Sequence, residues 1–86
     1  MMVDVVAVKV LEGHRLWLKF DDGAEGEFDF GLNLGFDGIF APLQDPQYFA
    51  LAKVDPDLGS VAWPNGADLD PLVLHAAVTG HAVQVA

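Results

Sequence analysis

The sequence predicts an α+β fold in which an antiparallel three-stranded meander is followed by a β-hairpin, with two short helices. Apolar and polar residues alternate along residues 15–20 and 25–30, which is the period of a strand. A second pair of strand-like stretches, residues 51–55 and 60–63, flanks a turn rich in Pro and Gly. Two Asp-Pro dipeptides supply the helix starts, because Asp caps free amides and Pro suits the first helical position.

The first strand is predicted over residues 3–11, whose apolar side chains fall on both alternating faces. One face carries Val6, Val8 and Val10, and the other carries Val3, Val5, Ala7 and Leu11. This pattern is typical of a strand that is covered on both sides. In the next two strands only one face is apolar, so we expect that face to line the core. The residues expected on it are Leu16, Leu18, Phe20, Phe28 and Phe30.

The register of the second and third strands follows from which of their residues, odd-numbered or even-numbered, face inward. Residues directly opposite each other share a face of the sheet, so the even-numbered inward residues must pair with each other. A three-residue loop, 21–23, satisfies this rule if Gly23 adopts a left-handed conformation at a bulge. The predicted pairs on the outer face are Lys19 with Glu25, Trp17 with Glu27, and Arg15 with Asp29. We interpret these charges as register control, since each opposite-charge pair adds about 0.2–1 kcal/mol.

Residues 31–38 are rich in Gly but do not form a phosphate-binding loop. No Lys-Ser/Thr follows them, and the spacing Gly-x-Gly-x-x-Gly is absent. We expect an irregular connection in which Leu32, Leu34 and Phe36 lie under the sheet.

The second half of the chain predicts helix, hairpin and helix. Asp45 and Pro46 open a short helix with Phe49 directed inward, and Asp70 opens another over residues 72–78 that Gly80 ends. Residues 81–86 are expected to be a tail, with the alternative that they add a strand to a sheet edge.

The stretch from Ser60 to Pro71 joins a strand, a tight turn and a helix start. Pro64-Asn65-Gly66 has the composition of a turn, and burial of Trp63 at the junction would fix all three elements together. The run from Trp63 to Leu69, preceded by Phe20-Asp21-Asp22-Gly23, resembles the bacterial family known as domain of unknown function 2442. Residues 42–46, followed by Phe49, fit the same pattern, and the resemblance covers roughly residues 3–75.

This resemblance implies no established activity and no catalytic residues. Some members of the family continue into a helix-turn-helix DNA-binding domain, and some are encoded beside genes of the toxin-antitoxin type. The resemblance therefore implies an antitoxin-like role as one possibility for this chain.

Composition bounds the classes of function. The chain has 86 residues and predicts one small domain, residues 1–80, with 81–86 as the tail. Its hydrophobic content of 52% is high for this length, so we expect some apolar surface to be buried in a homo-oligomer. The absence of cysteine fits a cytoplasmic protein, and no signal peptide or membrane span is predicted.

The net charge of −9, from 13 acidic and 4 basic residues, argues against nucleic-acid binding, which needs a cationic surface. It is compatible with a basic protein partner, whose approach an acidic surface would accelerate.

Catalytic and metal-binding chemistry is not indicated. Ser60 opens a strand and Thr79 ends a helix, so neither suggests a nucleophile beside a base. His14 is expected to be an exposed turn residue, and the spacing of His14, His75 and His81 is not that of a metal site. Asn65, Asp68 and Asp70 lack the Gly and Glu of a calcium loop and are assigned to turn closure and capping. No cofactor is predicted.

We predict a non-enzymatic protein-interaction module. The expected interaction residues are Trp17, Trp63, Asn65 and Asp68. Trp17 stands out because an aromatic on the polar face of a strand is typical of a binding contact. The alternative is a small-molecule binding domain with a pocket near Trp63 and Asn65.

Overall fold

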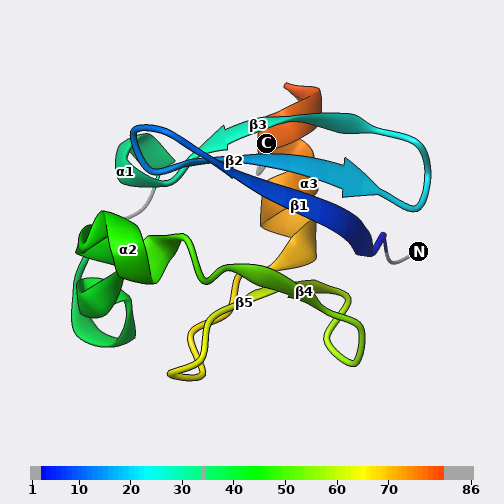
Figure 1. Ribbon diagram of the computed structural model, residues 1–86. Helices are drawn as coiled ribbons and strands as arrows, with labels where there is room; N and C mark the ends of the chain where they lie inside the picture. Colours follow the sequence, from blue (N-terminus) through cyan, green and yellow to red (C-terminus); the bar gives the residue numbers. More distant parts are fainter. Residues whose placement is uncertain (1–2, 34, 81–86) are drawn as a thin grey trace, which may run out of the picture.

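The computed structural model describes residues 3–33 and 35–80 (Figure 1). The elements in chain order are β1 (Val5–Leu11), β2 (Arg15–Phe20), β3 (Glu25–Asp29), α1 (Phe30–Asn33), the 3-10 helix η1 (Gly38–Gln44), α2 (Pro46–Phe49), β4 (Lys53–Asp55), β5 (Ser60–Ala62) and α3 (Pro71–Thr79). The antiparallel sheet β1-β2-β3, the hairpin β4-β5 and the short helices confirm the predicted α+β class. The predicted tail, residues 81–86, lies outside the described residues.

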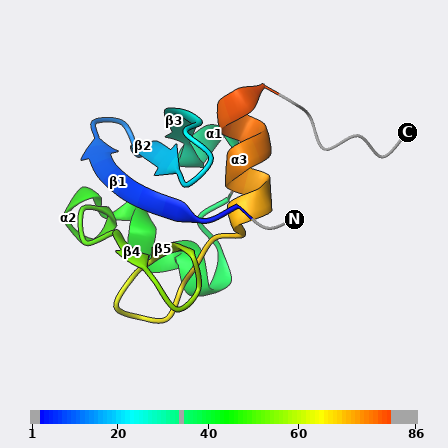
Figure 2. The ribbon, with the colours of Figure 1, turned by 90° about the vertical axis from the view of Figure 1, so that its right-hand side faces the viewer.

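The three-stranded sheet carries the other elements on one side. The hairpin β4-β5 and helix α2 lie below it, and α3 packs against β3 (Figures 1 and 2). Gly26 in β3 permits this close approach, because a Cβ at that position would lie 2.9 Å from Cγ1 of Val78 in α3. The core therefore lies between the inner face of the sheet, α3 and the hairpin.

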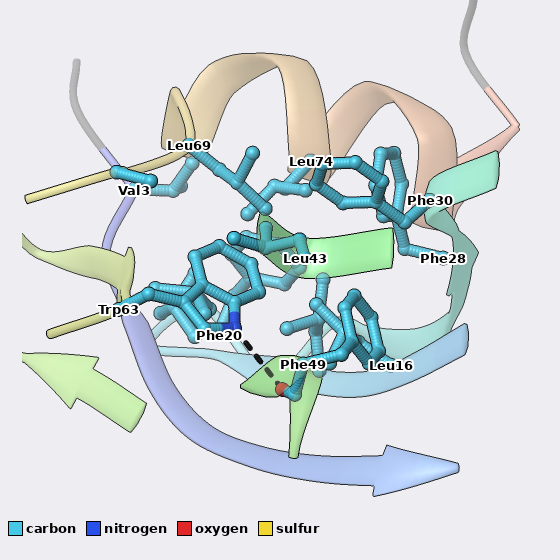
Figure 3. Close-up of a cluster of buried hydrophobic side chains, with 14 residues drawn as sticks. Val3, Leu16, Phe20, Phe28, Phe30, Leu43, Phe49, Trp63, Leu69 and Leu74 are labelled. Atoms are coloured by element: carbon cyan, nitrogen blue, oxygen red, sulfur yellow. Dashed lines mark hydrogen bonds between the residues drawn. The ribbon is translucent and has the colours of Figure 1, made fainter. Parts of the chain in front are cut away.

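An aromatic cluster fills this core (Figure 3). The ring of Phe30 lies 5.7 Å from Phe49 and 5.9 Å from Trp63, centroid to centroid. The indole N–H of Trp63 donates a hydrogen bond of 3.0 Å to the carbonyl oxygen of Phe49. Trp63 is 3% exposed, so its ring is buried at the end of β5, as the sequence predicts. The helix that its indole contacts is α2, through Phe49, whereas the sequence predicted a junction with the helix that Asp70 and Pro71 open.

The register of β2 and β3 matches the predicted one. Lys19 pairs with Glu25, Trp17 with Glu27 and Arg15 with Asp29, and Gly23 has the left-handed φ of 91° that the three-residue loop requires. The five predicted core residues Leu16, Leu18, Phe20, Phe28 and Phe30 are all buried. The ion pair on the outer face, however, is diagonal: the Arg15 guanidinium contacts Glu27 at 2.8 Å.

Strand β1 is not covered on both sides, which corrects the prediction for residues 3–11. The register shifts between Val5 and Ala7, where a β-bulge changes the face on which the following residues lie. Val3 and Val5 before the bulge are buried, and Val8 and Val10 after it also pack against the core. Val6 is left 52% exposed. The apolar residues thus serve one face, because the bulge moves the inward positions from odd to even numbers.

The connection after β3 is more regular than the Gly-rich sequence suggests, since it forms α1 and η1. The prediction that Leu32 lies under the sheet is wrong, because its side chain is 83% exposed. Asp29 accepts a hydrogen bond from the amide of Leu32 at 3.0 Å, which holds this turn in place. Phe36 does pack inward and stacks on Phe30 at 5.2 Å, whereas residue 34 lies outside the described residues.

His14 lies in the turn after β1, as predicted, but its side chain is only partly exposed. Its ring lies 5.0 Å from the rings of both Phe36 and Phe49, and its Nε2–H donates to the carbonyl oxygen of Gln44 at 3.0 Å. The backbone of His14 has a φ of 58°, which is uncommon for a residue with a side chain. The turn after β1 is thereby attached to η1 on the other side of the core.

The Asp-Pro dipeptides at residues 45–46 and 70–71 open helices, as predicted. Asp45 accepts from the amide of Gln47 and Asp70 from the amide of Leu72, each at 2.9 Å, and a Pro follows each cap. Gly80 ends α3 in the left-handed conformation.

A first prediction concerns the hydrogen bond between Trp63 and Phe49. We expect Trp63→Phe to lower the free energy of unfolding by about 2–4 kcal/mol, because it removes ring volume from the core and one of the two hydrogen bonds to the Phe49 carbonyl, which keeps only the amide of Ala52. The measurement is urea denaturation followed by circular dichroism. Trp17→Phe is the matched control and is expected to change stability by less than about 0.5 kcal/mol, as for most surface positions. Equal losses in the two variants would contradict the central role of Trp63.

Candidate functional site

The outer face of the three-stranded sheet is the candidate site, and we call it the Trp17 face. The registers place its residues in rows across β1, β2 and β3. The rows are Ala7–Lys19–Glu25, Lys9–Trp17–Glu27 and Leu11–Arg15–Asp29. The described helices and the second sheet lie on the opposite, inner side (Figures 1 and 2). In each row, three side chains from three neighbouring strands lie side by side on one surface of the sheet.

Trp17 lies at the centre of this face and is partly exposed. The Nζ atom of Lys9 lies 5.6 Å from the centroid of its ring, within the range of a cation–π contact. Arg15 Nη1 donates to Glu27 Oε1 at 2.8 Å, and Arg15 Nε donates to the carbonyl oxygen of Glu12 at 2.9 Å. These contacts hold the long side chains around the indole in defined positions.

Positive charge is concentrated on the Trp17 face. Of the four Lys and Arg residues in the chain, three lie there: Lys9, Arg15 and Lys19. Lys53 in β4 is the fourth. Trp17 was identified from the sequence, whereas Lys9 was missed, although alternation along the strand places it on the outer face. Glu25, Glu27 and Asp29 on the same face balance these three cations, so the face carries no net charge, which is unexpected in a chain whose net charge is −9.

The other predicted interaction residues have different positions. Trp63 is buried, as described above, and its indole N–H is used by Phe49. Asn65 is exposed, but its Oδ1 accepts from the amide of Ala67 at 3.0 Å and its Nδ2 donates to the carbonyl oxygen of Ile39 at 2.9 Å. These hydrogen bonds close the turn and attach it to η1. The structure therefore does not bring Trp63, Asn65 and Trp17 together on one surface.

Asp68 is exposed and borders a hollow of about 140 Å³ between β3, η1 and α3. The lining of the hollow comprises Phe28, Phe40, Asp68, Leu69, Asp70, Val73 and Leu74. Neither Trp63 nor Asn65 belongs to it, so the hollow is not at the predicted location. Its walls are mostly apolar, and Asp68 and Asp70 are the acidic residues among those that line it. It could not have been found from the sequence, because it depends on how α3 approaches β3 and η1.

Many polar side chains of the described residues bind the backbone of the same chain. Side-chain oxygens accept from the amide two residues further on at Asp22, Asp45, Asp55, Asn65 and Asp70. The hydroxyl of Ser60 donates to the carbonyl oxygen of Leu69, and Thr79 donates to that of His75 at 2.8 Å. Within residues 3–33 and 35–80, no three His, Asp or Glu side chains are grouped so as to hold a metal ion. These groups stabilise turns and helix ends.

His75 and Asp22 form the one ion pair that links α3 to the β2-β3 loop among the described residues. Nε2–H of His75 donates to Asp22 Oδ2 at 2.8 Å, and the imidazole packs edge-on against Phe20. The amide of Ala24, together with His75, lowers the pKa of Asp22 below its ordinary value of 3.8. The charged carboxylate therefore favours the folded chain.

A second prediction follows from this lowered pKa. A carboxylate whose pKa is depressed in the folded state stabilises that state above its unfolded pKa, and the contribution disappears as the pH falls through the folded pKa. The difference in urea midpoint between the wild type and Asp22→Asn should therefore be fully present above pH 3.8, and it should disappear as the pH falls below 3.8 through the lower pKa of the folded state. Urea titrations across this range, with Asp57→Asn as an exposed control, provide the test. A difference that is independent of pH would show that the charge on Asp22 contributes nothing.

The fold and this surface define a small α+β domain with an exposed, aromatic and charged sheet face. The chain belongs to the family described as Protein of unknown function (DUF2442), which matches residues 5–80. This match confirms the family resemblance found in the sequence, and the family description assigns no activity. No curated protein and no solved structure matched the chain. None of the helices in the described part of the chain has the length and apolar content that crossing a bilayer requires.

Proposed function

We propose that this chain is a non-enzymatic protein-interaction module that self-associates through the Trp17 face. The observation that carries the proposal is the position of Trp17, partly exposed at the centre of a sheet face and surrounded by Lys9, Arg15 and Lys19. Trp and Arg are the residues most often found at the energetic centres of interfaces. A ring held at the middle of a flat, rigid sheet can be buried by a partner with little loss of conformational entropy.

The remaining surface supports a basic protein as a further partner. With three cations on the Trp17 face, Lys53 is the one Lys or Arg elsewhere, whereas 13 acidic residues are distributed through the chain. Such a surface attracts a positively charged protein and accelerates the encounter. An antitoxin-like role, in which the chain covers and neutralises a basic protein, is the finer form of this proposal. We place the protein in the cytoplasm, in keeping with a sequence that has no cysteine.

A third prediction tests the Trp17 face. We expect Trp17→Ser to shift self-association to at least tenfold higher concentration, since it removes the aromatic centre of the interface. Sedimentation velocity over a concentration series measures the effect. Leu32→Ser is the matched control, because Leu32 is apolar and 83% exposed but lies in α1, outside the Trp17 face. A wild-type chain that remains a monomer at every concentration would overturn the proposal.

Small-molecule binding is the second candidate function, and the hollow between β3, η1 and α3 favours it. Its volume of about 140 Å³ is close to that of the apolar cavities of about 150 Å³ that accommodate benzene in other proteins. Its walls include Phe28, Leu69 and Leu74, which would offer an apolar ligand contacts on several sides. The carboxylates of Asp68 and Asp70 would favour a ligand with a positively charged end.

A fourth prediction separates this function from protein binding. We expect toluene to shift the NMR signals of the methyl groups of Leu69, Val73 and Leu74 in a saturable manner. Val73→Trp should abolish these shifts at Leu69 and Leu74, since Val73 lines the hollow and is 44% exposed, which leaves room for a larger ring to fill it. Leu72→Trp, on the neighbouring exposed position of α3, is the control. Shifts that persist in Val73→Trp would show that toluene binds elsewhere.

A further inference from the structure

We infer that the Trp17 face is complementary to itself, and that two copies of the chain stack face to face about a two-fold axis parallel to β2. This inference rests on the self-association proposed above and adds the arrangement of the two copies. The occupant of the face is a second copy of the same chain. The registers of the sheet and the sign of the charge in each strand determine how the two copies fit.

Each strand contributes one column of side chains to the face, and the columns differ in charge. The β1 column is Ala7, Lys9 and Leu11, and the β2 column is Lys19, Trp17 and Arg15. The β3 column is entirely acidic, with Glu25, Glu27 and Asp29. Positive charge thus lies on β1 and β2, and negative charge lies on β3. A surface that is divided in this way can be matched by a rotated copy of itself.

A two-fold axis parallel to the strands exchanges the outer columns and keeps the rows. The β1 column of one copy then faces the β3 column of the other, so that Lys9 meets the partner's Glu27. The same operation places Trp17 against the partner's Trp17 at the centre. The two Lys–Glu contacts flank the stacked indoles, and both are formed because the interface is isologous.

The other face-to-face arrangement brings like charges together. A two-fold axis perpendicular to the strands places each column over itself with the rows reversed. Lys9 would then face the partner's Lys9, and Glu27 would face the partner's Glu27. Lys19 would also face the partner's Arg15. Like charges directly opposite each other are destabilising, so the axis parallel to β2 is favoured.

The cations of the β2 column lie near the favoured axis, so Lys19 and Arg15 each approach the same residue of the partner copy. Arg15 is drawn away from the axis, because its guanidinium is bound to Glu27 at 2.8 Å in its own chain. Lys19 pairs in register with Glu25 and has a long, exposed side chain that can turn toward it. Stacked sheets also cross at about 30°, which separates side chains at the ends of the central strands. Trp17, near the middle of β2, stays in contact.

The size of the face indicates a weak dimer. The nine side chains in the three rows are fewer than the roughly 20–30 residues on each side of a standard stable interface. We therefore expect a concentration-dependent equilibrium, which makes small changes in charge easy to detect.

The test is complementation between two charge variants. Lys9→Glu places a carboxylate against the partner's Glu27, and Glu27→Lys places an ammonium group against the partner's Lys9. We expect each variant alone to dimerise at least tenfold more weakly than the wild type in sedimentation velocity. An equimolar mixture of the two variants should recover the dimer, because both contacts then join opposite charges. Lys53→Glu, which makes the same change in net charge as Lys9→Glu but in β4, is the control.

The mixture separates this interface from effects within one chain. Lys9→Glu loses the contact with Trp17, and Glu27→Lys loses the pair with Arg15, but mixing the variants restores neither. Recovery in the mixture therefore supports the two-fold arrangement, provided that circular dichroism shows both variants folded. A mixture that stays monomeric would overturn the arrangement. In that case, if Trp17→Ser still associates more weakly than the wild type, the proposal of self-association through the Trp17 face stands. A wild-type chain that is a monomer would overturn both that proposal and the two-fold arrangement.

Discussion

The hydrogen bond from the Trp63 indole to the Phe49 carbonyl, within a cluster of aromatic rings, is the contact on which the arrangement of the domain depends (Figure 3). Trp63 follows β5, Phe49 ends α2, and Phe30 follows β3, so the cluster joins the second sheet, a helix and the meander. A chain of 86 residues buries a limited core, and large rings supply much area for few residues. The donor also fixes the orientation of the indole, which an apolar ring of similar size would leave undetermined.

The position of the core leaves one face of the meander uncovered by the other described elements. The second sheet and α3 all pack on the inner face of the meander, which leaves the outer face for the side chains of Lys9, Trp17 and Glu27. Outside the Trp17 face, several side chains stabilise turns and helix ends. Asp45 and Asp70 cap helices, and the hydroxyl of Ser60 binds the carbonyl oxygen of Leu69. These groups are used within the chain, whereas the Trp17 face presents an indole and charged side chains to solvent, which is why the proposed interaction is placed there.

Local patterns made part of the fold predictable from the sequence, and contacts between distant segments determine the rest. The register of β2 and β3 followed from the parity of Phe20 and Phe28, because alternation reports which side chains share a face. The bulge at Val6 has no residue signature, so the change of face along β1 was missed. Trp17 was identified by its place on a polar face, but its cationic neighbour Lys9 belongs to another strand. Only the pairing of the two strands brings these residues of the candidate site together.

The charge of the chain also sets a limit on its self-association. Two copies that each carry −9 repel each other at long range, and this repulsion extends over about 8 Å at physiological ionic strength. In the proposed dimer, the cations of the Trp17 face would offset that repulsion at short range, because Lys9 of each copy would meet Glu27 of the other. The proposed basic partner would meet no such repulsion and would be attracted by the acidic residues outside the Trp17 face. The proposed dimer and the proposed basic partner therefore use different surfaces, the mixed charges of the Trp17 face for the first and the acidic residues outside it for the second.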